Sequence, residues 1–367
     1  MSAHAPSVAE PRATRRVLVV DDSAFMRQVV AELVAACPGF TVVGTARDGE
    51  DALAKVHALD PHVVTLDVEM PGLDGIAVLG YVMSEAPRPV VMLSAISDDA
   101  STLRALELGA VDFVRKPSGP ISLDLPRVRE RLHAALRAAA CTNVAATRVL
   151  ARPAFAEPGA EPRHPDAHAA TVVVLAASTG GPNALVQLVP RLHAPLGAAV
   201  LIAQHMPPGF TASLARRLDA LSTLRVVEAA AGMPVRPDHV YLSPGGAHLR
   251  VRRDSAGAPV CAVEAEPGGE GAGPRPSADV LFESAAATFG ATCVGVVLTG
   301  MGRDGARGLA AVCAAGGQAL VQAPAGAVVP GMPEAALARV PSAEVCTLEA
   351  LAEAVPRAAA RVTLALR

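Results

Sequence analysis

Short apolar runs that alternate with helical segments constrain the first part of the chain more than any other feature. Five runs rich in Val and Leu occur in residues 17–114, and each is followed by a segment with helical spacing of its apolar residues. Repeated βα units form a parallel sheet with helices on both faces. The pattern therefore predicts a doubly wound α/β domain at residues 15–138. The predicted strands are Val17–Val20, Thr41–Thr45, Val63–Leu66, Val90–Leu93 and Val111–Val114.

Reactive side chains follow the ends of these strands. Asp21 and Asp22 follow the first strand, Asp67 the third and Ser94 the fourth, and Lys116 lies just beyond the fifth. The carboxyl ends of parallel strands meet at one edge of the sheet, so the three carboxylates are expected to converge there. Converging carboxylates repel one another unless a cation lies among them, and Mg²⁺ suits oxygen ligands. We therefore predict a Mg²⁺ site in which a hydroxyl and a lysine stabilise a phosphoryl group on one aspartate.

With these residues in these places, residues 16–138 resemble the receiver domain of response regulators, which has a flavodoxin-like (βα)5 fold. The resemblance implies that Asp67 is the phosphoacceptor. It also implies that Asp22, Asp67 and the carbonyl of Glu69 ligate Mg²⁺, and that Asp21 reaches the ion through water.

The same resemblance implies that Ser94 and Lys116 contact the phosphoryl group, with Phe113 as the switch aromatic. A haloacid-dehalogenase-like phosphatase also forms an aspartyl phosphate. Such an enzyme would have a second acid two residues after the first, followed by Thr or Val, and Glu69-Met70 fits that pattern poorly.

The βα alternation restarts near residue 170, where an apolar run leads into a Ser-Thr-Gly-Gly turn and a helix predicted at Pro182–Leu192. Ser178 in this turn, His205 and Asp304 each follow an apolar strand. A serine nucleophile needs an imidazole to take its proton, and the imidazole needs a carboxylate to fix its tautomer. Because parallel strand ends lie side by side, we predict a Ser-His-Asp site in a second doubly wound α/β domain, residues 170–367.

Each member of this site also suits a structural role. The Ser178 turn would serve equally as a phosphate-binding or turn motif, His205 as a packed loop histidine and Asp304 as a helix N-cap. His248 is a further candidate, as a residue that contacts the site residues and not the substrate. Ala176 and the order Ser–His–Asp also depart from the Gly-x-Ser-x-Gly turn and the chain order of α/β-hydrolases.

Four motifs in this second part are similar to those of the chemotaxis protein-glutamate methylesterases. They are Ala177–Pro182, Gln204–Pro207, Pro276–Phe282 and Leu298–Gly305. The resemblance implies a phosphorylation-activated hydrolase of glutamate γ-methyl esters on methyl-accepting chemotaxis receptors, which also deamidates receptor glutamines. A chemotaxis histidine kinase would be the phosphodonor.

By the same resemblance, Ser178, His205 and Asp304 are catalytic, the hydrolase needs no cofactor, and Thr179 and Met301 line the substrate and oxyanion region. Two departures stand out. Ala176 occupies a position where the family usually has Gly, and residues 322–326 replace a segment that is usually rich in Gln, Asp and Glu. The second departure bears on substrate choice more than on the reaction.

Composition narrows the remaining possibilities. Residues 1–14 are expected to form a disordered tail and residues 139–169 a linker, because both lack apolar periodicity. A net charge of −3 argues against a nucleic-acid surface, and no apolar run approaches the ~20 residues that a membrane span requires. The six cysteines lie far apart and no leader is recognisable, so a reducing cytoplasm is expected.

Two other functions remain open at this point. One is a receptor deamidase with weak esterase activity. The other is a non-catalytic adaptor whose hydrolase-like domain only binds receptors, although the complete set of Ser178, His205 and Asp304 disfavours it.

Overall fold

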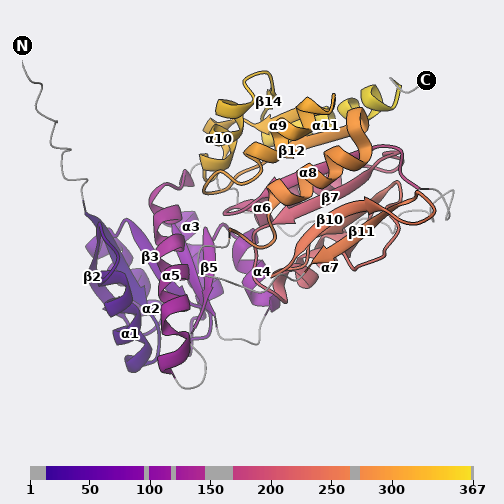
Figure 1. Cartoon of the computed structure of the whole chain (residues 1–367). Coiled ribbons are helices and arrows are strands. Elements are labelled where there is room, and N and C mark those ends of the chain that lie inside the picture. Colours follow the sequence, from indigo (N-terminus) through magenta and orange to yellow (C-terminus); the bar gives the residue numbers. More distant parts are fainter. Residues whose placement is uncertain (1–13, 95–98, 117–120, 145–167, 265–272, 365–367) are drawn as a thin grey trace, which may run out of the picture. The chain divides into compact units, whose positions relative to one another are not determined.

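The computed structural model describes residues 14–94, 99–116, 121–144, 168–264 and 273–364 (Figure 1). The chain forms two compact units, one from residues 1–96 and 113–140 and the other from residues 97–112 and 141–367. The predicted tail and most of the predicted linker fall outside the described residues, so the predicted domain limits stay predictions.

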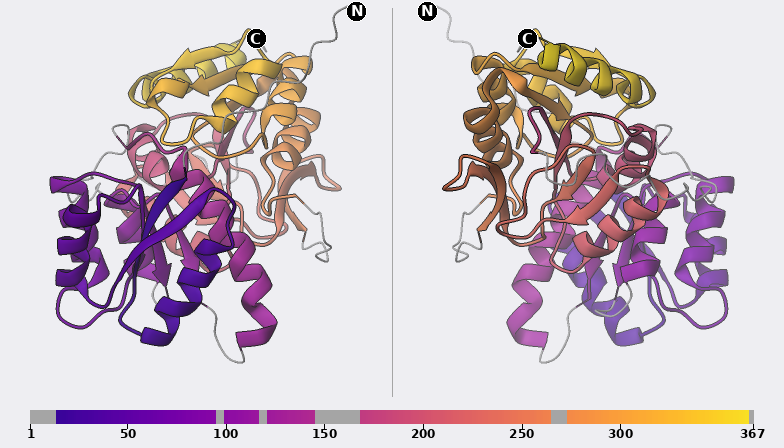
Figure 2. Two further views of the ribbon diagram at one scale, coloured as in Figure 1. Left: turned by 90° about the vertical axis from the view of Figure 1, so that its left-hand side faces the viewer. Right: turned by 90° about the vertical axis from the view of Figure 1, so that its right-hand side faces the viewer.

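The first unit contains a five-stranded sheet in the order β2-β1-β3-β4-β5, which confirms the predicted receiver fold (Figure 1, indigo to magenta). Helices α1 and α5 pack together, and so do α2 and α3; Figure 2 shows strands and helices from two further sides. The strands are β1 (Arg15–Val20), β2 (Phe40–Ala46), β3 (Val63–Asp67), β4 (Val90–Ser94) and β5 (Asp112–Arg115). The helices are α1 (Ala24–Ala35), α2 (Gly49–Leu59), α3 (Gly75–Glu85) and α5 (Ile121–Ala140), while α4 (Asp99–Glu107) falls within the second unit.

A close approach between backbones sets the position of α3 beside the end of β3. Gly75 opens this helix and donates its N–H to Val68 O at 3.0 Å. A Cβ atom on Gly75 would lie 1.9 Å from Asp67 O, so only glycine allows the helix to begin there. The helix start therefore helps to fix the Asp67 backbone.

The second unit is built on a seven-stranded parallel sheet in the order β14-β13-β12-β6-β7-β9-β8, which confirms the predicted α/β fold. Helices α8, α9 and α10 form one packed group, and α6, α7 and α11 form another (Figure 1). The strands are β6 (Val172–Ala177), β7 (Ala199–Gln204), β8 (Arg225–Glu228), β9 (His239–Leu242), β12 (Cys293–Val297), β13 (Gln318–Gln322) and β14 (Glu344–Cys346). The helices are α6 (Gly181–Leu188), α7 (Phe210–Leu221), α8 (Ala278–Phe289), α9 (Ala306–Ala314), α10 (Gly331–Arg339) and α11 (Leu348–Leu364).

Several elements differ from the sequence expectation. The helix predicted at Pro182–Leu192 ends at Leu188 and continues as a 3₁₀ turn, Val189–Arg191, because Pro190 has no N–H for the helical ladder. Helix α10 and the short strand β14 were not predicted. Strands β10 (His248–Arg253) and β11 (Pro259–Glu264) form a separate antiparallel pair that packs on α8.

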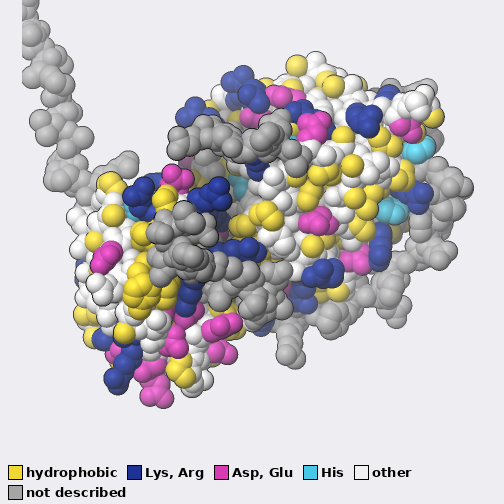
Figure 3. All heavy atoms as spheres, turned by 60° about the horizontal axis from the view of Figure 1, so that its bottom comes forward, with side chains coloured by type: hydrophobic (Ala, Val, Ile, Leu, Met, Phe, Trp, Pro, Cys, Tyr) yellow, Lys and Arg dark blue, Asp and Glu magenta, His cyan; other side chains and the backbone are white. Residues whose placement is uncertain are grey.

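The charged side chains at the surface and the apolar character of the helices concern two predictions that were made from composition. Basic and acidic side chains both occur on the face that Figure 3 shows. Among the described residues, none of the helices combines the length and apolar character that crossing a bilayer requires.

Candidate active site and candidate metal centre

The register of three neighbouring strands brings Ser178 and His205 together. Ala177 at the end of β6 is the partner of Gln204 at the end of β7, so the next residues, Ser178 and His205, lie at adjacent strand ends. The backbone N–H of His205 donates to Ala177 O at 3.0 Å. On the other side of β6, the N–H of Ser178 donates to Thr299 O at 3.0 Å. The end of β6 is thus tied to the strand ends on both of its sides.

Two glycines shape the turn that carries Ser178. Gly180 has a φ of +76°, and the N–H of Gly181 donates to Ser178 O at 2.8 Å, which closes the turn into α6. A Cβ atom on Gly300 would lie 2.7 Å from Ser178 Cβ, so the loop after β12 approaches the serine only because residue 300 is glycine. The predicted strand–turn–helix around Ser178 is confirmed.

The carboxylate of Asp304 is held by four donors. His205 Nε2 lies 2.7 Å from Asp304 Oδ2, which also accepts the N–H of Ala278 at 2.7 Å. Oδ1 accepts the Ser277 hydroxyl at 2.9 Å and the N–H of Asp279 at 3.0 Å. Burial alone would raise the pKa of Asp304, but the contact with His205 and the backbone N–H groups hold that pKa below its ordinary value. The group is therefore an anion beside the imidazole.

Asp304 does bind the start of a helix, but not of the helix that follows it in the sequence. The N-cap of the helix that follows it, α9, is Gly305, which makes no side-chain cap. Asp304 instead accepts two N–H groups at the start of α8. In return, Asp279 on α8 accepts the N–H of Gly305 at 2.9 Å and of Gly308 at 2.7 Å at the start of α9. Each helix start thus binds the carboxylate of a residue near the other one: Asp304 binds the start of α8, and Asp279 binds the start of α9. These reciprocal bonds fix Asp304 in front of His205.

The other residues predicted for the hydrolase site lie around Ser178. Thr179 is buried, and its carbonyl accepts the Thr299 hydroxyl at 3.0 Å. Met301 is 38% exposed in the loop after β12. Within the described part of the chain, no hydrogen bond joins Ser178 Oγ to His205; because Nε2 faces Asp304, Nδ1 is the ring nitrogen left for the serine.

Three residues near the site carry contacts that sequence reasoning did not resolve. His248 Nδ1 accepts the N–H of Ser277 at 3.2 Å, which places the histidine behind the start of α8. The roles of Asp279 and Gln204 were missed. Their positions inside the recognised motifs were the only available signal, because the sequence does not show which backbone groups their side chains reach.

The segment that replaces the family's acidic residues is also tied to the site. Gln322 at the end of β13 accepts the N–H of Thr299 at 2.8 Å and donates to Gly326 O at 3.2 Å. The amide of Gln322 thereby supports the strand end beside Ser178. Ala176, where the family usually has Gly, is fully buried, and a Cβ atom on Gly305 would lie 3.1 Å from its methyl group.

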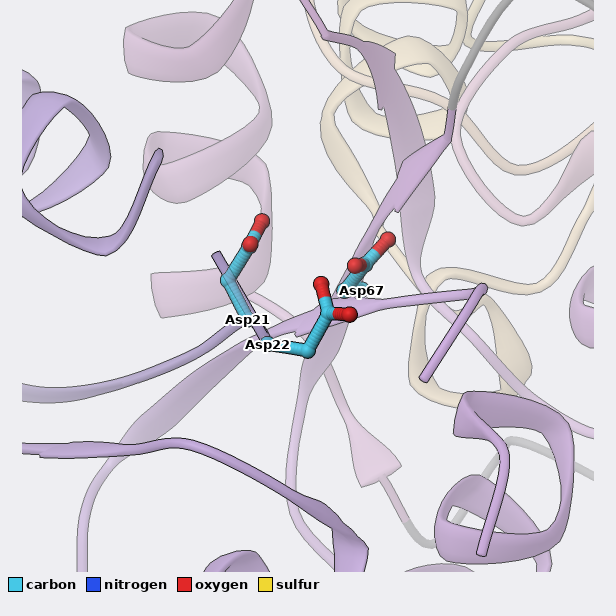
Figure 4. Close-up of side chains that lie close together, drawn as sticks. All are labelled: Asp21, Asp22 and Asp67. Carbon is cyan, nitrogen blue, oxygen red and sulfur yellow. The ribbon is translucent and has the colours of Figure 1, made fainter. Parts of the chain in front are cut away.

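The predicted acidic cluster is present in the first unit. Asp21, Asp22 and Asp67 each offer a carboxylate oxygen, and these oxygens lie within 4.8 Å of one another (Figure 4). Lys116 Nζ lies 2.8 Å from Asp21 Oδ2 and 2.6 Å from Asp67 Oδ2. Three carboxylates against one ammonium leave a negative excess, so the donor set fits a hard divalent cation.

Electrostatics at this cluster differ from those at Asp304. Burial raises the pKa of Asp67 to about 6; Lys116 opposes this rise, while the charge of Asp21 adds to it. Burial alone would lower the pKa of Lys116, but its hydrogen bonds with Asp21 and Asp67 raise it. The backbone N–H of Glu69 donates to Asp67 Oδ1 at 3.3 Å, and the Glu69 side chain is exposed.

The remaining predicted residues of the receiver lie at neighbouring strand ends. Ser94 and Phe113 are buried, and the N–H of Lys116 donates to Ser94 O at 2.8 Å. This bond holds the end of β4 against the residue just past β5, so Ser94 and Lys116 come from adjacent chain segments at the same edge of the sheet.

Comparison with known proteins gives matches to both halves of the chain. The family described as CheB methylesterase matches residues 173–355, and the response regulator receiver domain matches residues 17–125. A protein from Symbiobacterium thermophilum called protein-glutamate methylesterase/protein-glutamine glutaminase is 46% identical, over 94% of this chain and 96% of its own. A protein of the same name from Halalkalibacterium halodurans is 44% identical, over 93% and 97%.

Among solved structures, the CheB methylesterase catalytic domain of Thermotoga maritima is 33% identical, with a TM-score of 0.47, and covers 51% of this chain and 97% of its own. The response regulator domain of Thermotoga maritima CheB is 46% identical, with a TM-score of 0.33, and covers 35% and 97%.

Proposed function

Because this chain belongs to the CheB methylesterase family and carries a response-regulator receiver domain before its catalytic part, we propose that Ser178, His205 and Asp304 perform the hydrolysis. The activity is that of a phosphorylation-regulated protein-glutamate methylesterase and protein-glutamine glutaminase of chemotaxis. One observation carries the assignment of residues: His205, at the strand end next to Ser178, is paired with Asp304 at 2.7 Å.

The proposed reaction has two steps. Ser178 Oγ attacks the γ-carbonyl carbon of the glutamyl ester while His205 takes its proton, and the tetrahedral intermediate expels methanol, which receives that proton. Water then attacks the acyl-enzyme, His205 takes a proton from it, and the proton returns to Ser178 as glutamate is released. With glutamine as substrate, ammonia leaves in place of methanol.

Asp304 stabilises the imidazolium that forms in both steps. Its Oδ2 faces Nε2 of His205, which fixes the tautomer and leaves Nδ1 for the proton of Ser178. Because donors hold the pKa of Asp304 below its ordinary value, the carboxylate stays ionised when the imidazole takes up its proton.

The oxyanion needs backbone donors that are not already engaged. The N–H groups of Ser178, Gly181 and Gly300 donate to Thr299 O, Ser178 O and Val329 O, respectively. Among the described residues of these two loops, Thr179, Gly180, Met301 and Gly302 donate no backbone N–H bond, and of these N–H groups we choose those of Thr179 and Met301 as our candidates for the oxyanion hole. The exposed Met301 side chain would then border the entry of the substrate.

In the receiver domain, we assign Asp67 as the phosphoacceptor. Receiver domains are phosphorylated in a Mg²⁺-dependent reaction, and the ion would be held by Asp22, Asp67 and the carbonyl of Glu69, with Asp21 reaching it through water. Bound Mg²⁺ supplies positive charge against the carboxylates and the incoming phosphoryl oxygens.

Three further residues complete this proposal for the receiver. Lys116 already contacts Asp67 and is placed to bind a phosphoryl oxygen on it. Ser94 would donate to a second oxygen, and Phe113 would change its packing with phosphorylation. The receiver implies a phosphodonor kinase, and the methylesterase family implies receptor substrates. We propose a chemotaxis histidine kinase and methyl-accepting chemotaxis receptors.

The test is methanol release from membranes that carry methylated receptors, with ammonia release measured in parallel. We expect Ser178→Ala to release neither, and a serine-directed fluorophosphonate probe to label the wild type but not this variant. Ammonia far in excess of methanol would favour the deamidase. Absence both of labelling and of release of either product would favour the non-catalytic adaptor.

A further inference from the structure

Gln204 joins the two chain segments that carry Ser178 and His205. It is the last residue of β7 and is 1% exposed. Its side-chain amide Nε2 donates to Ser178 O at 2.9 Å and to His205 O at 3.1 Å. A single amide group therefore bonds to the backbone of the proposed nucleophile and of the proposed base.

We propose that Gln204 is a positioning residue that fixes the separation between Ser178 and His205. This inference rests on the proposed function, because it assigns a role relative to the proposed catalytic pair. Gln204 acts through the backbone of both residues and does not itself contact the substrate.

The place of the amide in the sheet explains why such a link is needed. The ladder between β6 and β7 ends with the bond from His205 N–H to Ala177 O. Beyond that bond the two strands diverge into separate turns, and no further ladder bond connects them among the described residues. The two N–H groups of the Gln204 amide extend the connection by one residue on each strand. Misplacement of a catalytic pair by about 1 Å can cost a factor of ~10² in rate.

The side-chain carbonyl oxygen of Gln204 argues against a role for this residue in stability alone. Gln204 Oε1 is buried and has no hydrogen-bond partner among the described residues. A Cβ atom on Gly181 would lie 2.0 Å from this oxygen, so the first residue of α6 has to be glycine for the amide to fit. An unpaired buried acceptor is unfavourable for folding, and a role in catalysis is one of the reasons for which native proteins retain such a group.

The first experiment uses Gln204→Met in the full chain, because Met has nearly the same volume and lacks the donors. We expect kcat for methanol release to fall about 10-fold to 10²-fold, with KM within about two-fold. The rate of labelling by a fluorophosphonate probe should fall by a similar factor. The control is Gln187→Met, which removes another buried amide, one that donates to Asn183 Oδ1 at 2.6 Å on α6. Its kcat and labelling rate should match those of the wild type.

A second variant, Gln204→Glu, separates positioning from packing. An ionised carboxylate would face two carbonyl oxygens, whereas a protonated one keeps a single donor. The ratio of variant to wild-type kcat should therefore rise as pH falls, and taking the ratio removes the pH dependence that the two enzymes share. A ratio that is constant with pH would contradict the inference.

The failure of this inference can be told apart from the failure of the proposed function. If Ser178→Ala keeps its activity, the catalytic assignment is wrong and Gln204 has no catalytic pair to position. If Ser178→Ala is inactive but Gln204→Met keeps the kcat and labelling rate of the wild type, the positioning role alone is wrong. An equal loss of kcat and of melting temperature in Gln204→Met and Gln187→Met would also overturn it.

Discussion

Asp67 in the receiver is the last residue of the buried strand β3, and Asp304 in the catalytic unit lies in the loop that follows the buried strand β12, yet their carboxylates have opposite surroundings. Asp67 shares its site with two further aspartates and one lysine, and its pKa is raised to about 6. Asp304 accepts hydrogen bonds from His205, a hydroxyl and two N–H groups at the start of α8, and its pKa is lowered. In both units the topology brings carboxylates to one edge of a sheet. The groups that lie beyond the strand ends then determine whether the pKa of the carboxyl group is raised or lowered.

The contrast matches the two roles that we propose. A carboxylate among like charges gains from a cation and a phosphoryl group, so the receiver site responds to its ligands. A carboxylate that already accepts hydrogen bonds at both oxygens needs no rearrangement of its surroundings during the reaction, so Asp304 can orient His205 throughout. One site is therefore suited to switching and the other to repeated turnover.

The largest effect is expected at the catalytic serine. Ser178→Ala should lower methanol and ammonia release by about 10³-fold or more, because no other group can form the acyl-enzyme. Labelling of the same variant by a small phosphodonor such as acetyl phosphate should be unchanged. Loss of that labelling would show that the two sites are not independent.

Asp304→Asn should lower kcat by at least ~10²-fold, because the Asn amide would present a donor to the imidazole. Asn is not an equivalent replacement for Asp304 at the start of α8, because both carboxylate oxygens accept a backbone N–H and the Asn side chain has only one acceptor oxygen. A loss of about 1–3 kcal/mol in the free energy of unfolding should accompany the loss of activity.

Ser277→Ala is the matched control for that variant. It removes one donor to Asp304 and the N-cap of α8, which costs about 1 kcal/mol, but leaves the contact with His205 in place. Chemical denaturation and kcat should be measured on both variants. Asp304→Asn with the kcat of Ser277→Ala would show that another group orients His205.

The raised pKa of Asp67 predicts an effect on stability. Between about pH 4 and 6 the native state binds more protons at this group than the unfolded state does, so the free energy of unfolding falls as pH rises through that interval. Asp67→Asn in a chelating buffer should therefore be more stable than the wild type by about 2 kcal/mol at pH 7.5, and the difference should vanish near pH 4.

Addition of Mg²⁺ tests the same site from the other direction. Mg²⁺ should stabilise the wild type and have little effect on Asp67→Asn, which loses one proposed ligand. Melting temperatures with and without the ion, at both pH values, measure this. A variant that is stabilised by Mg²⁺ as much as the wild type would contradict the ligand assignment.

The smallest effect is expected from coupling between the two sites. The linked receiver should inhibit in its resting state, so acetyl phosphate and Mg²⁺ should raise methanol release several-fold in the full chain. Asp67→Ala should abolish labelling and the response while keeping the basal rate. A fragment that begins near Ala169 should exceed the unphosphorylated full chain in activity. Equal activities would contradict inhibition by the receiver.

Much of the fold could be predicted because it depends on local patterns. Apolar runs of strand length and helical spacing gave both doubly wound domains, and the glycines after β6 gave the turn that carries Ser178. The short strand β14 and helix α10 were missed, because three residues carry no periodicity and α10 begins with Gly and contains Pro at its third position. Pro190 could have shortened the predicted helix in advance.

The sequence by itself determined which residues stand at strand ends, and hence that Asp21, Asp22 and Asp67 would meet in one domain and Ser178 and His205 in the other. Only the tertiary structure decided which donors each carboxylate receives. Asp304 contacts the start of α8, and Gln204 bonds across the end of a strand pair. Each of these bonds joins residues that are 26 positions apart in the sequence, and its geometry depends on how whole helices pack against the sheet. Local sequence patterns carry no information about that packing, because many side chains of similar volume would give the same pattern.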